Sequence, residues 1–258
     1  MPTECHVFMR DTWVVFSRAM RLSLRQPVWV VFGLIQPVLY LALFGPLLKG
    51  VAAAPGFGGA DPWLVFVPGL LVQLGLLGAA FVGFGIISEW RCGVIERMRV
   101  TPASRAALLL GRVLRDVVVL FVQAALLTGM AMLFGLSAPW WALLLGVVMV
   151  ASLGACFSAL SYGIALELKS EDAFAPLLNG VSLPLLLLSG VLLPMSMGPL
   201  WLQRLSQLNP LRYVLEGLRA VYRGELRASE TWLGIGMTII LAVVGVAIGT
   251  RMFQKESE

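Results

Sequence analysis

Charged residues and histidine are scarce in this sequence. Of its 258 residues, 13% are charged and 59% are hydrophobic, whereas soluble domains usually carry about 25% charged residues. His6 is the only histidine, which excludes a multi-histidine metal site and a Ser-His or Cys-His pair elsewhere in the chain. Together these shortages exclude a disordered chain and an ordinary cytosolic enzyme.

The sequence also lacks the motifs of nucleotide-binding and nucleophilic enzymes. It contains no phosphate-cradling GxxxxGK[ST] loop and no GxSxG motif. Its three cysteines are far apart and form no CxxC pair. No charge lies at the centre of an apolar run, where a proton- or sodium-coupled carrier usually places a carboxylate. We therefore expect no catalytic residue, metal or cofactor on this chain, and energy for uphill transport would come from another polypeptide.

Long apolar runs are the feature that the sequence has in abundance. A membrane-spanning helix needs about 20 apolar residues, and six runs approach or exceed this length. The predicted spans cover residues 28–48, 63–88, 113–134, 140–166, 173–193 and 232–250. The runs are continuous and rich in leucine, without the alternation of barrel strands. The sequence therefore predicts an all-α, multi-pass membrane protein with six transmembrane helices.

The basic residues indicate how these helices are oriented. With both termini cytoplasmic, 13 Lys and Arg lie inside and 6 outside, in agreement with the positive-inside rule. If the fifth run only dips into the membrane and returns, residues 194–231 move inside and the ratio becomes 16 to 3. On charge alone the second topology scores better than the first. The net charge of +5 is assigned to cytoplasmic loops, and no nucleic-acid partner is expected.

Residues 1–27 are predicted to form an N-terminal cytoplasmic interface helix. Arg18, Arg21 and Arg25 recur at i, i+3 and i+7 and share one helical face. An apolar set at helical spacing lies on another side: Trp13, Phe16, Met20 and Leu24. Such a helix lies on a membrane surface. Two roles remain open, a plain membrane anchor and an anchor that also touches a cytoplasmic partner.

The connection between the second and third runs, residues 89–116, is long and charged. Thr101 followed by Pro102 is a typical N-cap and first-turn pair, so a helix is predicted to start there and continue into the third span. Before it, residues 94–100 are predicted to form a short helix. Its exposed residues would be Glu96, Arg97 and Arg99. The segment is either a docking element for a soluble protein or a solvated loop whose arginines hold lipid phosphates.

Residues 194–231 are predicted to contain two short amphipathic helices. Asn209–Pro210 stops the first. The second carries an apolar stripe and, opposite it, a ladder of charges at i, i+3 and i+4 spacing. The stripe consists of Leu211, Val214, Leu215, Leu218, Val221 and Tyr222, and the ladder of Arg212, Glu216, Arg219 and Arg223. We interpret the ladder as structural rather than as a substrate contact.

Three motifs in this sequence resemble those of type-2 ABC transporter permeases. The first is the coupling element of Gly93, Glu96, Arg97, Arg99, Thr101, Pro102 and Arg105. The second is Gln36-Pro37 with Phe44-Gly45 in the first span. The third is a C-terminal signature of Gly190, Asn209, Pro210, Tyr213 and Arg219. The likeness covers nearly the whole chain and is strongest to daunorubicin/doxorubicin-resistance drug-efflux permeases, followed by lipo-oligosaccharide and polysaccharide exporters.

The resemblance implies a complete architecture. Residues 28–258 would form a type-2 ABC transmembrane domain with a cytoplasmic coupling helix between helices 2 and 3 and short re-entrant helices between helices 5 and 6. Both termini would be cytoplasmic in a bacterial inner membrane. Two ABC ATPase subunits, which bind ATP and Mg, and a second permease copy, identical or homologous, would complete an exporter that works by alternating access.

The cargo is less defined than the architecture. An apolar, nearly uncharged interior suits an amphipathic drug or antibiotic, or a lipid-linked molecule. Candidates for the substrate path are Gln36, Tyr40, Gln73 and Phe81, although such residues are also typical of helix-packing contacts. A secondary carrier or channel acting alone, and an intramembrane enzyme, are the competing hypotheses.

Overall fold

The computed structural model describes residues 2–25, 28–51, 61–93, 104–191, 195 and 198–255. These residues form helices and connecting turns, and no strand occurs among them. The helices are α1 (Pro2–Arg25), α2 (Val28–Val51), α3 (Pro62–Ala80), α4 (Gly83–Arg91), α6 (Arg105–Phe134), α7 (Trp140–Leu168), α8 (Glu171–Ser189), α9 (Leu200–Ser206), α10 (Pro210–Tyr222) and α11 (Ser229–Lys255). The all-α prediction is confirmed for this part of the chain.

Five helical segments are long and apolar enough to cross a membrane. They are α3 and α4 taken together, α6, α7, α8 and α11. The remaining predicted span, residues 28–48, coincides with α2, whose described apolar stretch is Val31–Gly45. Because this stretch is shorter than a full crossing, the structure supports five spans and the six-span arrangement stays a prediction.

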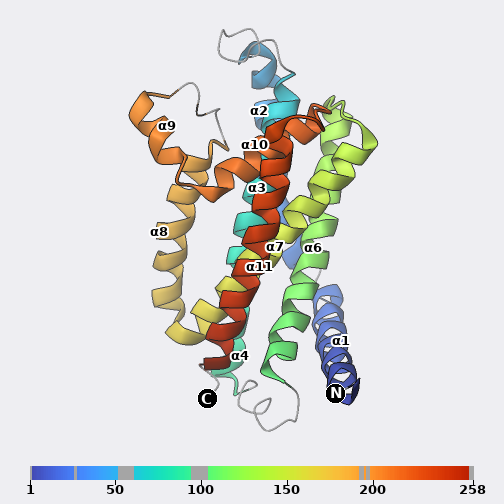
Figure 1. Ribbon diagram of the computed structural model, residues 1–258, viewed down its shortest axis with the longest axis vertical. Helices are drawn as coiled ribbons and strands as arrows, with labels where there is room; N and C mark the ends of the chain where they lie inside the picture. The colour runs from blue at the N-terminus through green and yellow to red at the C-terminus, as the bar shows by residue number, and fades with distance from the viewer. Residues whose placement is uncertain are drawn as a thin grey trace.

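The spanning helices run between two ends of the molecule (Figure 1). Both termini lie at one of them, which we call the basal end, with the start of α8 and the end of α4. Glu171 at the start of α8 pairs with Arg91 of α4, whereas the carbonyl of Gly190 after α8 contacts Arg219 of α10 at the opposite end. The fifth run therefore passes from one end to the other and does not dip and return.

The centre of the bundle is α7, which packs against α3, α4, α6 and α11. Its contact with α11 is a backbone-to-backbone crossing. A methyl group added to Gly249 would collide with the carbonyl oxygen of Ala159, and one added to Gly245 would collide with Cys156. Small residues allow this close approach between spanning helices, and the two helices form one rigid pair.

The second predicted span, 63–88, is two helices rather than one. The helix is interrupted by a turn at Phe81 and Val82, between α3 and α4. The Ser161 hydroxyl of α7 enters this break, donating to the carbonyl of Ala80 (2.6 Å) and accepting from the amide of Gly83 (3.0 Å). Insertion of a side chain into the hydrogen-bond ladder is an established cause of helix breaks.

Two helix ends also differ from the predicted ones. The helix that continues into the third span begins at Arg105, and its N-cap is Ser104, whose hydroxyl accepts from the amide of Ala107 at 3.3 Å. It begins later than the predicted cap, Thr101, which lies outside the described residues. Helix α8 ends at Ser189, before the predicted residue 193, because Gly190 follows with a left-handed φ of 82°.

At the end opposite the termini, α10 is amphipathic as predicted, but its charged face differs. Leu211, Leu215 and Leu218 are buried in the core with the rest of the apolar stripe. Arg212 pairs with Glu216 at 2.7 Å, as the ladder requires. Arg219 does not join the ladder: it is 7% exposed and turns inward between α3 and α8.

Candidate functional site

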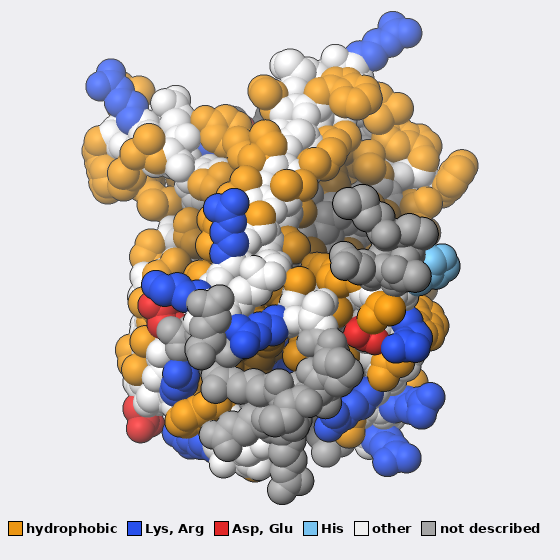
Figure 2. All heavy atoms as spheres, turned by 60° about the horizontal axis from the view of Figure 1, so that its bottom comes forward, with side chains coloured by type: hydrophobic (Ala, Val, Ile, Leu, Met, Phe, Trp, Pro, Cys, Tyr) orange, Lys and Arg blue, Asp and Glu red, His pale blue; other side chains and the backbone are white. Residues whose placement is uncertain are grey.

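Charged side chains gather at the basal end, on both sides of the segment that joins α4 to α6. Figure 2, with this end turned forward, shows Lys and Arg side chains concentrated there and apolar side chains above them. The basal cluster, as we call it, consists of Glu89, Arg91, Arg112, Arg115, Asp116, Tyr162 and Glu171. Its members come from four helices, α4, α6, α7 and α8.

The first contact of the cluster is an ion pair between the end of α4 and the start of α6, on either side of the connection that joins them. Glu89 lies in the last turn of α4 and Arg112 in the third turn of α6. The Arg112 guanidinium donates to the Glu89 carboxylate at 2.5 Å. The Arg112 side chain is only 9% exposed, and shielding from water strengthens an ion pair with good geometry. The two ends of the connection are therefore joined.

The second contact joins α6 to α7 through a buried carboxylate. Asp116 is 3% exposed. Its carboxylate accepts a 2.7 Å hydrogen bond from the Tyr162 hydroxyl and forms an ion pair with Arg115 at 3.2 Å. Arg115 also donates to the Tyr162 oxygen at 3.4 Å. A buried carboxylate is tolerated only when it is paired and hydrogen-bonded, so this triad holds α6 and α7 in a defined register.

Two further contacts extend the connections to α8 and α11. Arg91, the last residue of α4, forms a 3.2 Å ion pair with Glu171 at the start of α8. Arg105, the first residue of α6, donates to the backbone carbonyl of Gln254 near the end of α11 at 3.1 Å. Residues on both flanks of the α4–α6 connection are thus bonded to neighbouring helices.

The predicted coupling residues fall on this connection. Gly93 follows α4 with a left-handed φ of 68°, which favours glycine. Arg105 lies at the other flank, where it contacts α11. The other predicted members, Glu96, Arg97, Arg99, Thr101 and Pro102, lie outside the described residues. The structure therefore describes the two supports of the predicted coupling element and leaves its role as a prediction.

The predicted signature residues come together at the opposite end. Asn209 caps α10 by accepting from the amide of Leu211 at 3.0 Å and donates to the carbonyl of Leu185 at 2.6 Å. Pro210 is the first residue of α10, and Tyr213 donates to the carbonyl of Gln207 at 3.0 Å.

Arg219 links three elements at that end. Its guanidinium donates to the carbonyls of Val65 (3.1 Å) and Gly190 (2.9 Å), so it connects α3, the end of α8 and α10. Burial lowers the pKa of Arg219 to about 10, and the side chain remains protonated at neutral pH. The signature thus acts as a structural joint, and none of its described contacts requires a ligand.

The four substrate-path candidates lie on two helices. Gln36 donates to the Tyr40 hydroxyl at 3.3 Å, one turn further along α2. Gln73 is buried within α3. Phe81 caps the end of α3 and stacks on Phe84, with ring centroids 6.0 Å apart. Their role in a substrate path stays a prediction.

Sequence reasoning missed the interior members of the basal cluster. By sequence, Arg112 and Arg115 fall in the charged connection between the second and third runs, and neither Asp116 nor Tyr162 has a predicted role. A usable signal is present: Arg112, Arg115 and Asp116 lie at i, i+3 and i+4 and share one face of the helix that is predicted to continue into the third span. Close to the start of a span, such a charged face must be buried or paired.

Comparison with known proteins gives two kinds of likeness. The family described as "ABC-2 type transporter" matches residues 10–222, which include the basal cluster, α9 and α10. A Cyanophora paradoxa protein named "Putative transport permease ycf38" is 26% identical over 263 residues, covering 96% of this chain and 89% of the relative. A protein of the same name from Pyropia yezoensis is 27% identical over 232 residues, covering 84% of this chain and 75% of the relative.

Proposed function

The chain belongs to the ABC-2 type transporter family, and on this premise we propose that it is the permease subunit of an ATP-driven exporter. A membrane-embedded permease of this family is not itself an enzyme. ATP and Mg would bind to two separate ABC ATPase subunits, and a second permease copy would complete the transporter. Both termini and the basal end would face the cytoplasm of a bacterial cell, across its inner membrane.

The anchoring of the α4–α6 connection is the observation that carries this proposal. Glu89 and Arg112 join its two ends, and Arg91 and Arg105 bond to α8 and α11. A force applied to residues 94–103 would therefore reach several helices at once. A solvated loop without a partner would gain nothing from such supports.

The length of α6 suggests how the force is used. Its 30 residues run from the connection to the opposite end, about 45 Å at 1.5 Å per residue. When ATP binding closes the two ATPases, they would push on Glu96 to Arg99. The push would tilt α6 with α7, because the Asp116–Tyr162 contact joins them, and the permease pair would open outward.

The cargo is proposed from the surface of α2. The described part of α2 exposes apolar side chains such as Phe32, Ile35 and Leu39, and the hydrogen-bonded Gln36–Tyr40 pair adds polarity to the same helix. Such a surface suits an amphipathic drug or antibiotic, or a lipid-linked molecule. Lipo-oligosaccharide or polysaccharide export is the alternative within the same mechanism.

The proposal is tested at the coupling element. We expect Glu96→Ala combined with Arg97→Ala to leave membrane insertion intact and to abolish transport-stimulated ATP hydrolysis, because the contact that receives the push is lost. Hydrolysis is measured in proteoliposomes containing permease and ATPase. Glu225→Ala combined with Arg227→Ala, which removes the same two charges from the exposed surface at the opposite end, is the matched control.

Two results would contradict the proposal. Normal stimulation in the Glu96→Ala, Arg97→Ala variant would exclude docking through this segment. Transport by the permease reconstituted alone, driven by an ion gradient, would instead identify a secondary carrier. Co-purification of the permease with a soluble ATPase distinguishes these hypotheses before any transport assay.

A further inference from the structure

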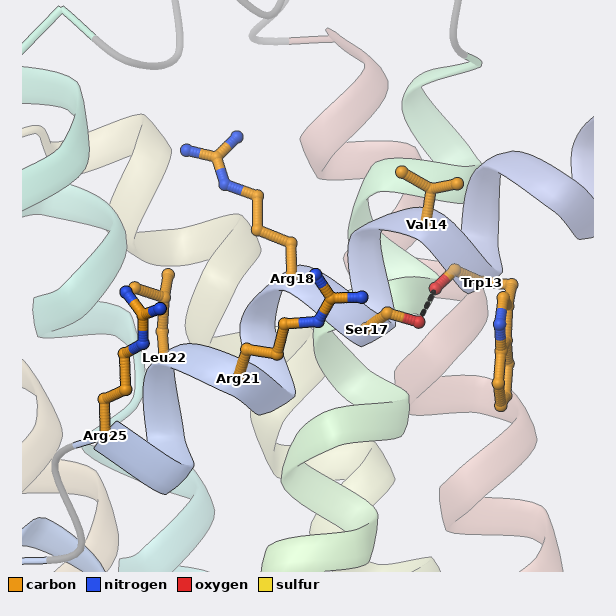
Figure 3. A pocket seen from close by; sticks show the side chains of 7 residues that line it. All are labelled: Trp13, Val14, Ser17, Arg18, Arg21, Leu22 and Arg25. Carbon is orange, nitrogen blue, oxygen red and sulfur yellow. Dashed lines mark hydrogen bonds between the residues drawn. The ribbon is translucent and has the colours of Figure 1, made fainter.

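The outward face of α1 carries a shallow, open cationic hollow that the coupling proposal does not use. Its volume is about 510 Å³, and all of its lining residues come from α1 itself, among them Arg18, Arg21, Arg25, Trp13 and Leu22. Figure 3 shows the three guanidinium groups standing away from the α1 ribbon. Helix α1 packs on α6 through its other side, where Val15 lies against Gly111.

The three arginines have no acidic partner among the described residues. Elsewhere on α1, Arg10 lies 3.7 Å from Asp11, and the arginines of the basal cluster all pair with carboxylates. Arg18, Arg21 and Arg25 are exposed, and no ion pair is formed by them within the described chain. Three guanidinium groups on one face, free of carboxylates from the described chain, can bind an anion from outside.

Apolar side chains lie beside the arginines on the same helix. Met9 is 66% exposed, Trp13 63% and Leu24 72%. Neither α6 nor any other described helix covers them. An exposed apolar stripe next to an arginine face is the pattern of a helix that lies in a membrane interface, with the arginines at the level of the headgroups.

We propose that Arg18, Arg21 and Arg25 form a binding site for the phosphodiester headgroup of an anionic phospholipid. Trp13 and Leu22 would pack against the glycerol and upper acyl region of the bound lipid. The planar guanidinium fork can donate two parallel hydrogen bonds to the two non-bridging oxygens of a phosphodiester. The site requires only that the chain is embedded in a membrane, and it would operate whether or not an ATPase is attached.

The site is tested by lipid titration of the full chain purified in a neutral detergent. The probes are fluorescent phosphatidylglycerol and the matching phosphatidylcholine. We expect wild type to prefer phosphatidylglycerol. Arg18→Gln combined with Arg21→Gln should weaken phosphatidylglycerol binding by roughly 30-fold, because each arginine near an anionic lipid surface strengthens binding by roughly five-fold. The matched control, Arg204→Gln combined with Arg227→Gln, removes two exposed arginines from the opposite end and should bind as wild type does.

The outcomes separate this proposal from its competitors. Equal affinity of wild type for the two lipids, or unchanged phosphatidylglycerol binding in the Arg18→Gln, Arg21→Gln variant, overturns it. Displacement of the lipid by millimolar inorganic phosphate would indicate a free-anion site and also overturns it. If the Arg18→Gln, Arg21→Gln variant no longer co-purifies with the ATPase but binds lipid as wild type does, the arginine face of α1 is a protein interface and the proposal is wrong. Arg18→Lys combined with Arg21→Lys, which keeps the charge but removes the guanidinium forks, should bind phosphatidylglycerol more weakly than wild type and more strongly than the Gln variant. Thermal melting of the Gln variant in the same detergent shows whether its fold is intact.

Discussion

Asp116 occupies a position where an unpaired carboxylate would be very unfavourable. It is enclosed by α6 and α7, and both its partners are themselves mostly shielded from water. Removing a partner from a buried charge costs more than the same change at the surface, because the remaining group cannot recover its hydration. The Tyr162 hydroxyl is therefore more important to the structure than its small size suggests.

We expect Tyr162→Phe to lower the free energy of unfolding by about 1.5–3 kcal/mol, the range for a hydrogen bond to a charged group. The substitution removes the bonds to Asp116 and Arg115 and keeps the ring. Thermal melting of the purified protein in detergent measures the effect. Tyr40→Phe is the matched control, because its hydroxyl accepts only a long, exposed bond from Gln36. Equal melting of the two variants would show that the buried triad adds no stability.

At the scale of helices, the break between α3 and α4 depends on a residue from another element. The carbonyl of Ala80 and the amide of Gly83 both bond to the Ser161 hydroxyl. Gly83 must be glycine, because a methyl group there would collide with Phe174 and Ser161. The break thus places α4, which carries Glu89 and Arg91, at a fixed position relative to α7 and α8.

We predict that Ser161→Ala lowers the free energy of unfolding by about 1–3 kcal/mol, since two buried backbone groups lose their partner. Melting in detergent is again the measurement. Ser152→Ala, on the same helix, removes an exposed hydroxyl that bonds only to its own turn at Val148, and it should change stability little. A Ser161→Ala protein as stable as that control would mean that water or a rearranged turn replaces the hydroxyl.

The sequence predicted those elements whose signal is local. The apolar period of α10 and the stop at Asn209–Pro210 between the two short helices depend on neighbouring residues, and the structure agrees with both. The break at Phe81 could not be predicted, because the hydroxyl that stabilises it is 78 positions from Gly83. Arg219 was misplaced for a similar reason: its helical spacing suited the ladder, but its partners are carbonyls of α3 and Gly190.

At the scale of the whole molecule, α8 packs less extensively against the other described helices than the other spans do. In its apolar stretch 28% of the residues are buried, against 56% for α7. Its ends are nevertheless connected, by Glu171 to Arg91 and by Gly190 to Arg219. A helix held at its two ends and lightly packed between them can shift as a unit when either support moves. The basal support lies next to the proposed coupling element.

A charge exchange tests this connection. We expect Arg91→Glu to reduce transport-coupled ATP hydrolysis several-fold, because the new carboxylate repels Glu171. Combining it with Glu171→Arg should restore most of the activity. Stability should change little, since both side chains are about half exposed and such ion pairs contribute about 0–1 kcal/mol. If the double variant is no better than the single one, the pair does not transmit the motion.

The glycine crossing of α7 and α11 limits where cargo can travel. At Gly249 the backbone of α11 lies directly against the Ala159 carbonyl of α7, and at Gly245 it lies against Cys156. Parting the two helices would lose this close packing, which small residues make possible, so we expect the seam to stay closed when other helices move. If the chain translocates a molecule as proposed, we expect the path to lie on the side of the bundle formed by α2, α3 and α8.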